Sequence, residues 1–131
     1  MLRKFLLGKI HRAVVTHCDI DYVGSITIDA DLLRATGIRP NESVLIADCD
    51  NGNRFETYVF EGEPGSGVIG VNGAAARLVE PGHRLIVCAW AHLDAAELDR
   101  HEARVVVVDA DNRIVQRLTY PSTLGESAVG V

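Results

Sequence analysis

The peptide bond between Gly24 and Ser25 is the first place in the sequence where the residue types suggest chemistry. Glycine has no Cβ, so its carbonyl can be approached closely and its backbone can adopt strained angles. The hydroxyl of Ser25 would then attack the Gly24 carbonyl and convert the amide to an ester. Alone this is a weak signal, because Gly-Ser is ordinary turn chemistry.

The elements that must position this bond are those of a small β-rich protein. β-branched runs alternate with Gly, Pro, Asn and Asp, which mark turns. Asn51-Gly52 tolerates the positive φ angles of tight hairpins, so we expect a hairpin around residues 50–53. Asp29 can cap a helix that ends at Gly37. The pattern predicts strands at 9–16, 24–28, 44–47 and 54–60, and a helix between Asp29 and Thr36.

In the second half of the chain, β-branched runs again alternate with residues that mark turns. Three alanines after Asn72-Gly73 favour a short helix, and Pro81-Gly82 predicts a turn. From Pro121 onward the residues are small or polar, which predicts a flexible tail over 121–131. We expect strands at 68–71, 85–90, 105–108 and 114–115, a short helix over 72–77, a charged surface helix from Asp94 to Arg104, and a turn at Asp109–Asn112.

Composition limits the class of protein. The chain has 131 residues, of which 47% are hydrophobic and 24% charged, ordinary values for one folded domain. Its net charge of −5 makes nucleic acid a poor partner, since binding to the phosphate backbone depends on concentrated positive charge. The apolar run from Leu85 to Ala91 is far shorter than the ~20 residues that a membrane-spanning helix needs.

The cysteine and histidine positions give no sign of a metal. Cys18, Cys49 and Cys88 are odd in number and have no C-x-x-C spacing, which argues against a disulfide framework or a cysteine zinc site. The histidines also lack a metal-binding spacing. We therefore expect a cytoplasmic protein with reduced thiols and no metal ion.

Five ordered stretches resemble the aspartate 1-decarboxylase family, the small pyruvoyl enzymes of pantothenate biosynthesis. The resemblance covers roughly residues 1–120, and the five motifs in this order and spacing are highly specific. The stretches are Leu7–Arg12 (LGKIHR), Thr16–Asp19 (THCD), Tyr22–Ser25 (YVGS), Asn51–Tyr58 (NGNRFETY) and Val71–Ala76 (VNGAAA).

The resemblance implies a mainly β fold, a small double-psi β-barrel with short helices, formed by one domain over residues 1–120. It also implies a homotetramer with active sites between subunits. The precursor would cleave itself between Gly24 and Ser25 into residues 1–24 and 25–131, through an ester that breaks by β-elimination. Hydrolysis with loss of ammonia would then convert Ser25 to a covalent pyruvoyl group.

The implied reaction converts L-aspartate to β-alanine and CO2 and supplies pantothenate and coenzyme A biosynthesis. Loss of CO2 leaves a carbanion that water stabilises poorly. A Schiff base between the pyruvoyl group and the substrate amine would accept that electron pair, as pyridoxal phosphate does in other decarboxylases. No diffusible cofactor is then required.

By the same resemblance, three side chains would handle the substrate. The planar guanidinium of Arg54 suits the side-chain carboxylate, because it forms two parallel hydrogen bonds. Lys9 can meet the α-carboxylate. Tyr58 is the expected proton donor, since a phenol with a pKa near 10 keeps its proton at pH 7. Without the resemblance, an exposed arginine, an exposed lysine and a packed tyrosine would be the plainer interpretations.

The remaining expected site residues lie near these. Thr57 is expected to bind substrate and to stabilise the oxyanion at the Gly24 carbonyl during cleavage, although an ideal strand points it away from the Tyr58 side. Asn72 opens a turn of small residues at a helix start, where anions are favoured. The substrate-binding set includes Asn72, Gly73, Ala74 and Ala75, and His11, Tyr22 and Ala76 are expected to line the site.

Two alternatives stay open at this point. One is a pyruvoyl decarboxylase that acts on another acidic amino acid such as glutamate, which the pocket length beyond Arg54 would decide. The other is a non-catalytic barrel that uses its hairpins for assembly or partner binding, which predicts an uncut chain with no need for Ser25.

Overall fold

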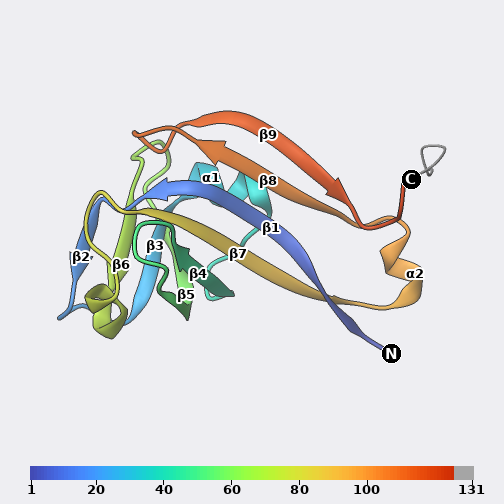
Figure 1. Ribbon diagram of the computed structural model, residues 1–131, viewed down its shortest axis with the longest axis horizontal. Helices are drawn as coiled ribbons and strands as arrows, with labels where there is room; N and C mark the ends of the chain where they lie inside the picture. Colours follow the sequence, from blue (N-terminus) through green and yellow to red (C-terminus); the bar gives the residue numbers. More distant parts are fainter. Residues whose placement is uncertain (126–131) are drawn as a thin grey trace.

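The computed structural model describes residues 1–125, and nine strands dominate it (Figure 1). The strands join one sheet in the order β2-β6-β3-β5-β4-β7-β1-β8-β9. Most pairings are antiparallel, but β1–β8, β2–β6 and β3–β5 are parallel. The elements are β1 (Arg3–Val14), β2 (His17–Asp19), β3 (Ser25–Asp29), α1 (Ala30–Thr36), β4 (Ser43–Asp48), β5 (Arg54–Gly62), β6 (Ile69–Asn72), the 3₁₀-helix η1 (Gly73–Arg77), β7 (Arg84–Leu93), α2 (Ala95–Leu98), β8 (Glu102–Val108) and β9 (Ile114–Pro121).

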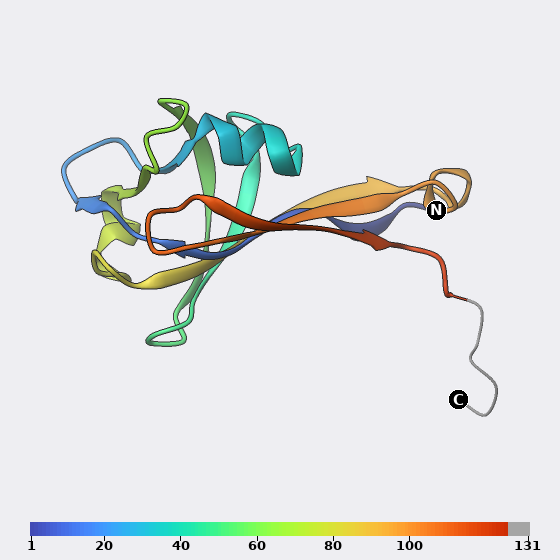
Figure 2. The ribbon, with the colours of Figure 1, turned by 90° about the horizontal axis from the view of Figure 1, so that it is seen from above.

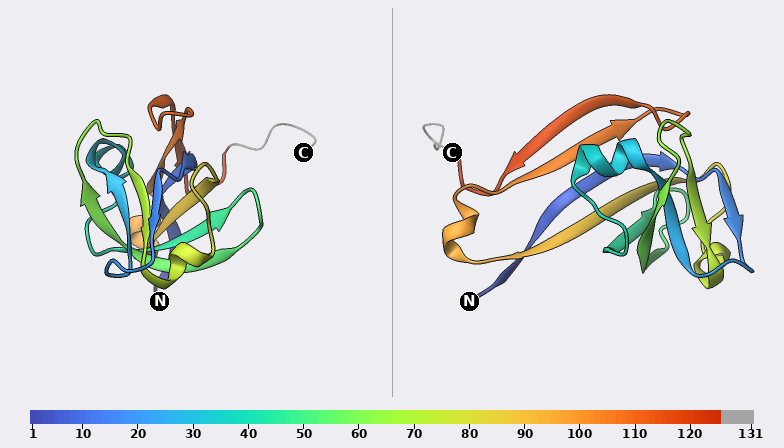
Figure 3. Two further views of the ribbon diagram at one scale, coloured as in Figure 1. Left: turned by 90° about the vertical axis from the view of Figure 1, so that its left-hand side faces the viewer. Right: turned by 180° about the vertical axis from the view of Figure 1, so that it is seen from behind.

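The molecule has a compact end and a long arm. The short strands, α1 and η1 gather at the compact end, and four long strands run from it to α2 at the far end (Figures 1 and 2). These four strands are β1, β7, β8 and β9, and their pairing continues along the arm as far as Arg3 opposite Leu93. In the end-on view, the strands of the compact end surround its centre (Figure 3, left).

The core follows from period-two alternation in the strands, which sends successive side chains to opposite faces. β7 buries Leu85, Val87 and Ala89 completely, while the residues between them lie on the other face. β4 does the same with Val44 and Ile46. Buried β-branched side chains from neighbouring strands pack between them and form one continuous hydrophobic cluster. The opposite face of β5, β4, β7 and β1 is therefore free to carry polar side chains.

The predicted caps of helix α1, Asp29 and Gly37, are confirmed. The Asp29 side chain accepts a hydrogen bond from the Asp31 backbone N–H, and Gly37 ends the helix at φ +78°. The predicted hairpin is also confirmed, because β4 and β5 flank residues 49–53 and pair without a register shift. The short helix after Asn72 forms as the 3₁₀-helix η1, which begins at Gly73 with φ +74°.

The predicted charged helix from Asp94 to Arg104 is wrong. Asp94 and Glu97 form a capping box, yet α2 ends at Leu98 and β8 begins at Glu102. Residues 102–104 instead pair with β9, where Glu102 lies opposite Pro121 and Arg104 opposite Thr119. Tertiary strand pairing overrides the helical propensity of so short a segment, which has no buried face of its own.

The mainly β class with short helices is confirmed. The sheet order leaves β2 and β9 as its two edges, so the sheet does not close, and the double-psi barrel stays a prediction. Part of the predicted tail is described: Pro121 ends β9 and the Ser122 backbone N–H donates to the His101 carbonyl. Residues 126–131 of that tail lie outside the described residues. No helix within residues 1–125 is long and apolar enough to cross a membrane.

Candidate active site

Ser25 is fully buried at the first position of β3, where it pairs with Asn72 of β6. The Asn72 Nδ2 atom donates to Ser25 Oγ at 3.0 Å and to Thr27 Oγ1 at 3.2 Å. The Ser25 hydroxyl in turn donates to the Val23 carbonyl at 3.1 Å. A serine that the sequence places in an ordinary turn is therefore held in a closed hydrogen-bond network, away from water.

The residue before Ser25 lies in the opposite environment. Gly24 is exposed, and it belongs to the loop that joins β2 to β3. Gly73, the first residue of η1, approaches it so closely that a Cβ at Gly73 would lie 2.6 Å from Gly24 Cα. Only glycine fits this approach and the positive φ of residue 73 together. The start of η1 is thus packed directly against the Gly24-Ser25 bond.

β5 carries the next two predicted residues, Thr57 and Tyr58, beside the start of β3. Ile26 of β3 lies opposite Val59 of β5 in parallel register, and this is the first pair of the two strands. Ser25 and Tyr58 directly precede this pair, whereas Gly24 lies in the loop outside the paired strands. The β4–β5 register has no bulge between Arg54 and Tyr58, so Thr57 and Tyr58 do point to opposite faces. The structure gives Thr57 no side-chain hydrogen bond to Gly24 among the described residues.

Three aromatic rings lie on the outer side of this region. The Tyr58 ring meets Phe60 edge-to-face at 5.7 Å between centroids, and Phe60 meets Tyr22 at 6.3 Å. Tyr58 and Tyr22 remain 41% and 52% exposed. Phe60, which the sequence analysis did not single out, therefore orients both predicted tyrosines, and its i+2 spacing from Tyr58 was the signal for a shared face.

Lys9, His11 and Arg54 share the outer face of the sheet formed by β1, β7, β4 and β5. Strand registers place His11 and Arg54 in one row, with Ile86 and Ala47 between them. Lys9 lies in the adjacent row, directly opposite Cys88. Among the described residues, neither Lys9 nor Arg54 has a side-chain hydrogen bond or an ion pair. Both cations are available to an anionic ligand.

Lys9 and Arg54 both affect the pKa of the same group on this face, the Cys88 thiol. Burial raises the pKa of the Cys88 thiol, while Lys9 and Arg54 both act in the opposite direction. Burial, with Lys9 and Arg12 nearby, lowers the pKa of His11 below its ordinary value of 6.5. The buried His11 Nδ1 atom has no hydrogen-bond partner. Lys9 and Arg54 thus place positive charge on this face, which Glu56 shares through its row with Leu45, Cys88 and Lys9.

The remaining predicted residues belong to η1. The Asn72 side chain does not cap this helix, because it is already bound to Ser25 and Thr27. Ala74 is exposed, and Ala75 is partly buried against the core. Ala76 is buried, and its expected place in the lining of the site stays a prediction. The first residues of η1 are thus adjacent to Ser25 through Asn72.

These residues form two separate groups on one chain. Ser25, Asn72, Tyr58 and the start of η1 lie together, and Lys9, His11 and Arg54 lie further along the same sheet. Arg54 and Tyr58 are four positions apart on β5, a rise of about 13 Å. A cavity of about 660 Å³ between α1 and the β8–β9 hairpin contains neither group.

Asp48, Asp50 and His83 are the one group of possible metal ligands found within residues 1–125, with atoms within 4.8 Å of one another. Their atoms already have protein partners. Asp48 accepts from the Asp50 backbone N–H and pairs with His83 at 2.7 Å, and Asp50 accepts twice from Arg84. The arrangement is a hydrogen-bonded link between two loops.

Comparison with known proteins shows similarity over most of the chain. The family model described as aspartate decarboxylase matches residues 1–115. An aspartate 1-decarboxylase of Neisseria meningitidis serogroup C is 52% identical over 120 residues, which cover 92% of this chain and 94% of that protein.

Proposed function

The chain belongs to the aspartate decarboxylase family, and on this premise we propose that it converts L-aspartate to β-alanine and CO2. The β-alanine would supply pantothenate and coenzyme A biosynthesis. We further propose that the chain is a zymogen that cleaves itself at Gly24-Ser25, and that the double-psi barrel expected for the family describes its compact end. Its free thiols at Cys18, Cys49 and Cys88 suit a cytoplasmic enzyme.

The observation that carries the proposal is the position of Ser25. A serine that only marks a turn would be exposed, yet this hydroxyl is buried and bound by Asn72 beside an exposed glycine. The position suits a covalent pyruvoyl group formed from Ser25, because the residue is already shielded from water and faces a hydrogen-bond donor. Such a group would supply the electron sink that α-decarboxylation needs.

The cleavage step uses this chain's own groups. Ser25 Oγ attacks the Gly24 carbonyl carbon, the amide C–N bond breaks, and the proton moves to the Ser25 nitrogen. Thr57, two residues before the Val59 that pairs with Ile26, would donate to the developing oxyanion. Elimination then releases the Gly24 carboxylate, and hydrolysis of the dehydroalanine releases ammonia.

The remaining residues bind the substrate and handle a proton. Arg54 would grip the side-chain carboxylate, and Lys9 would meet the α-carboxylate on the outer face. The backbone N–H groups of Gly73, Ala74 and Ala75, at the start of η1, would orient the substrate beside Ser25. Tyr58, close to Ser25 in the register and partly exposed, would deliver the proton to the substrate α-carbon.

Lys9 and Arg54 have no side-chain partner among the described residues, so both remain available to a site outside their own chain. We propose that Lys9, His11 and Arg54 of one copy complete the Ser25 site of another, within the homotetramer that the family resemblance implies. The exposed Ile20, Tyr22 and Val23 around the cleavage loop would be covered in that assembly, which would exclude water from the site.

Intact-mass spectrometry during incubation tests the proposal. The purified chain should separate into residues 1–24 and 25–131, and the larger fragment should react with hydrazine and have no free amino terminus. It should release CO2 from L-aspartate. A Ser25→Ala protein should stay uncut and inactive. Wild-type activity in that uncut variant would overturn the proposal, and faster turnover of glutamate would reassign the substrate.

A further inference from the structure

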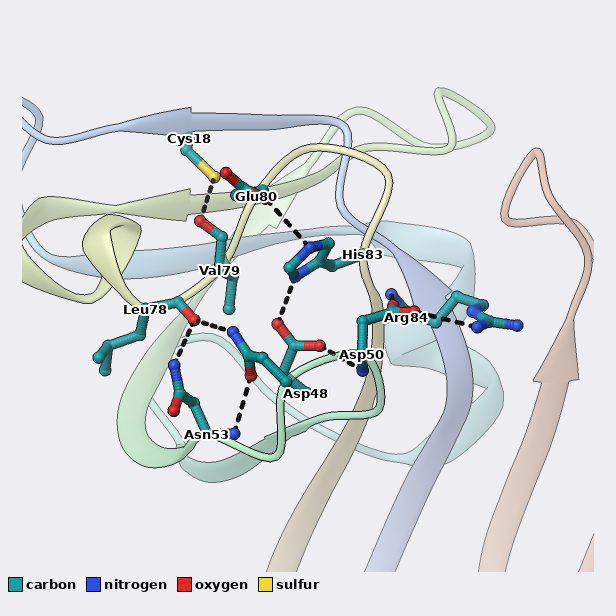
Figure 4. Close-up of polar contacts among 10 residues, drawn as sticks. Cys18, Asp48, Asp50, Asn53, Leu78, Val79, Glu80, His83 and Arg84 are labelled. Atoms are coloured by element: carbon teal, nitrogen blue, oxygen red, sulfur yellow. Dashed lines mark hydrogen bonds and ion pairs between the residues drawn. The ribbon is translucent and has the colours of Figure 1, made fainter.

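A hydrogen-bond network fastens the β4–β5 hairpin to the connection between η1 and β7 (Figure 4). Asn51 Nδ2 and Asn53 Nδ2 both donate to the Leu78 carbonyl, at 2.9 Å and 2.8 Å. Asn51 Oδ1 also accepts from the Asn53 backbone N–H at 2.8 Å, which fixes the hairpin's own shape. A single carbonyl of the connection thus holds two side chains of the hairpin.

His83 makes the second attachment. Its Nδ1 atom lies 2.7 Å from Asp48 Oδ2 at the end of β4, and its Nε2 atom lies 3.3 Å from Glu80 Oε2. The Asp48 side chain is completely buried, and the backbone N–H of Asp48 donates to the Asn53 carbonyl. A buried carboxylate requires such partners, so the contact cannot be released without a large desolvation cost.

Further contacts close the network on both sides. The Arg84 backbone N–H and guanidinium both donate to Asp50, at 2.7 Å and 3.0 Å. On the other side, Cys18 Sγ of β2 donates to the Val79 carbonyl. The connection over residues 78–84 is therefore held between β2 and the hairpin, as the close-up shows (Figure 4).

The network lies between the two groups of residues that the proposed function assigns to the substrate. Arg54 directly follows Asn53, and Leu78 is the C-cap of η1, whose first residue packs against Gly24. η1 has five residues and therefore spans about 10 Å, from the Gly24-Ser25 bond to the connection that binds the hairpin. Any shift of the hairpin against this connection moves Arg54.

We propose that His83, Asp48 and Asn53 are positioning residues that hold the Arg54 hairpin against the η1 connection and so set the affinity for the substrate carboxylate. This rests on the proposed function. None of the three needs to touch the substrate: they act by restricting the backbone from which Arg54 extends. The guanidinium must match a carboxylate in two hydrogen bonds at once, so a displacement of about 1 Å is costly.

Steady-state kinetics of fully cleaved enzyme test this inference. His83→Leu and Asn53→Ala should each raise KM for L-aspartate about 10-fold, the effect of losing roughly one hydrogen bond, with kcat changed less than about twofold. His83→Asn keeps a donor near the Nδ1 position and should restore most of the affinity. His101→Leu is the control, because the His101 ring also makes a side-chain contact, from Nε2 to the Leu6 carbonyl at 2.8 Å, but on the arm.

The pH dependence gives a readout that a general loss of stability would not move. The groups facing His83 are Asp48, Asp50 and Glu80, with Arg84 adjacent and Cys18 beyond Glu80. Its bond to Asp48 raises the pKa of His83 above 6.5. Wild-type KM should therefore increase as the pH rises above 6.5 and through the raised pKa of His83, and His83→Asn should lack this component.

The outcomes separate the two proposals. If wild-type protein neither cleaves nor decarboxylates aspartate, the proposed function fails. If wild type is active but His83→Leu and Asn53→Ala have the wild-type KM, the positioning role is wrong. It is also wrong if these two variants change kcat and KM only as much as His101→Leu does.

Discussion

The region around Ser25 and the outer face that carries Arg54 are organised in opposite ways. Around Ser25 two contacts are already made: Asn72 binds the serine hydroxyl and Gly73 packs on Gly24. On the outer face, Lys9 and Arg54 have no side-chain partner among the described residues, and the buried His11 Nδ1 is unpaired. The serine hydroxyl is thus held by groups of its own chain, whereas the cations of the outer face remain available to a ligand or a second copy.

This difference indicates which of the two proposed steps, self-cleavage or substrate binding, each region can perform alone. Self-cleavage is a reaction within one chain, so its groups can be pre-organised as the chain folds. Binding a dicarboxylate needs unpaired cations, because a guanidinium already bound to protein cannot grip a substrate. Changes near Ser25 should therefore affect cleavage, and changes on the outer face should affect substrate affinity after cleavage.

Thr57→Val should have the largest effect on cleavage. Removing one donor to an oxyanion costs about 100-fold or more in rate, so intact chain should accumulate. A mass-spectrometric time course measures this, and Thr57→Ser should recover most of the rate. Cleavage of Thr57→Val at the wild-type rate would show that the Thr57 hydroxyl has no role in cleavage.

Arg54→Lys tests the outer face. Lysine keeps the charge but loses the two parallel hydrogen bonds, so we expect KM for L-aspartate to rise about 30-fold. The cleavage rate should stay within about twofold of wild type, because Arg54 lies about 13 Å from Tyr58 along β5. Slow cleavage in this variant would mean that the outer face also takes part in cleavage, contrary to the separation of the two regions.

Asn72→Ala should slow cleavage about 10-fold, because it leaves the buried Ser25 hydroxyl without its donor. Asn112→Ala is the matched control. Both asparagines are 2% exposed, but Asn112 binds backbone groups of Val14 and Gly67 far from the cleavage bond. Equal slowing in the two variants would mean that the effect is general loss of stability.

The smallest expected effect is on stability. The bond to Asp48 raises the pKa of His83, so this contribution is fully present below the ordinary value of 6.5 and is lost as the pH rises through the raised value. His83→Leu should lower Tm by a few degrees at about pH 5.5 and by less at about pH 9, where the pair is weaker in wild type too. Calorimetry at both values measures the difference, and a larger loss at the higher pH would contradict this sign.

Local sequence was enough for several elements. Asp29 and Gly37 define α1, Asn51-Gly52 defines the hairpin, and Gly73 with its alanines defines η1, because each signal acts through neighbouring residues. The segment from Asp94 to Arg104 was predicted wrongly because its structure depends on distant strands. The network of His83 with Asp48 was not predicted either, since the two residues are far apart in sequence.

By itself, the sequence determined the family motifs, the Gly24-Ser25 bond at which we propose cleavage and the residue types that we propose bind a dicarboxylate. These depend on identity and order, which the chain carries directly. Only the tertiary structure decided that Ser25 is buried beside Asn72, that Thr57 and Tyr58 face opposite ways, and that Lys9 and Arg54 share a face. Strand register sets these relations, and register depends on pairing between residues that are distant along the chain.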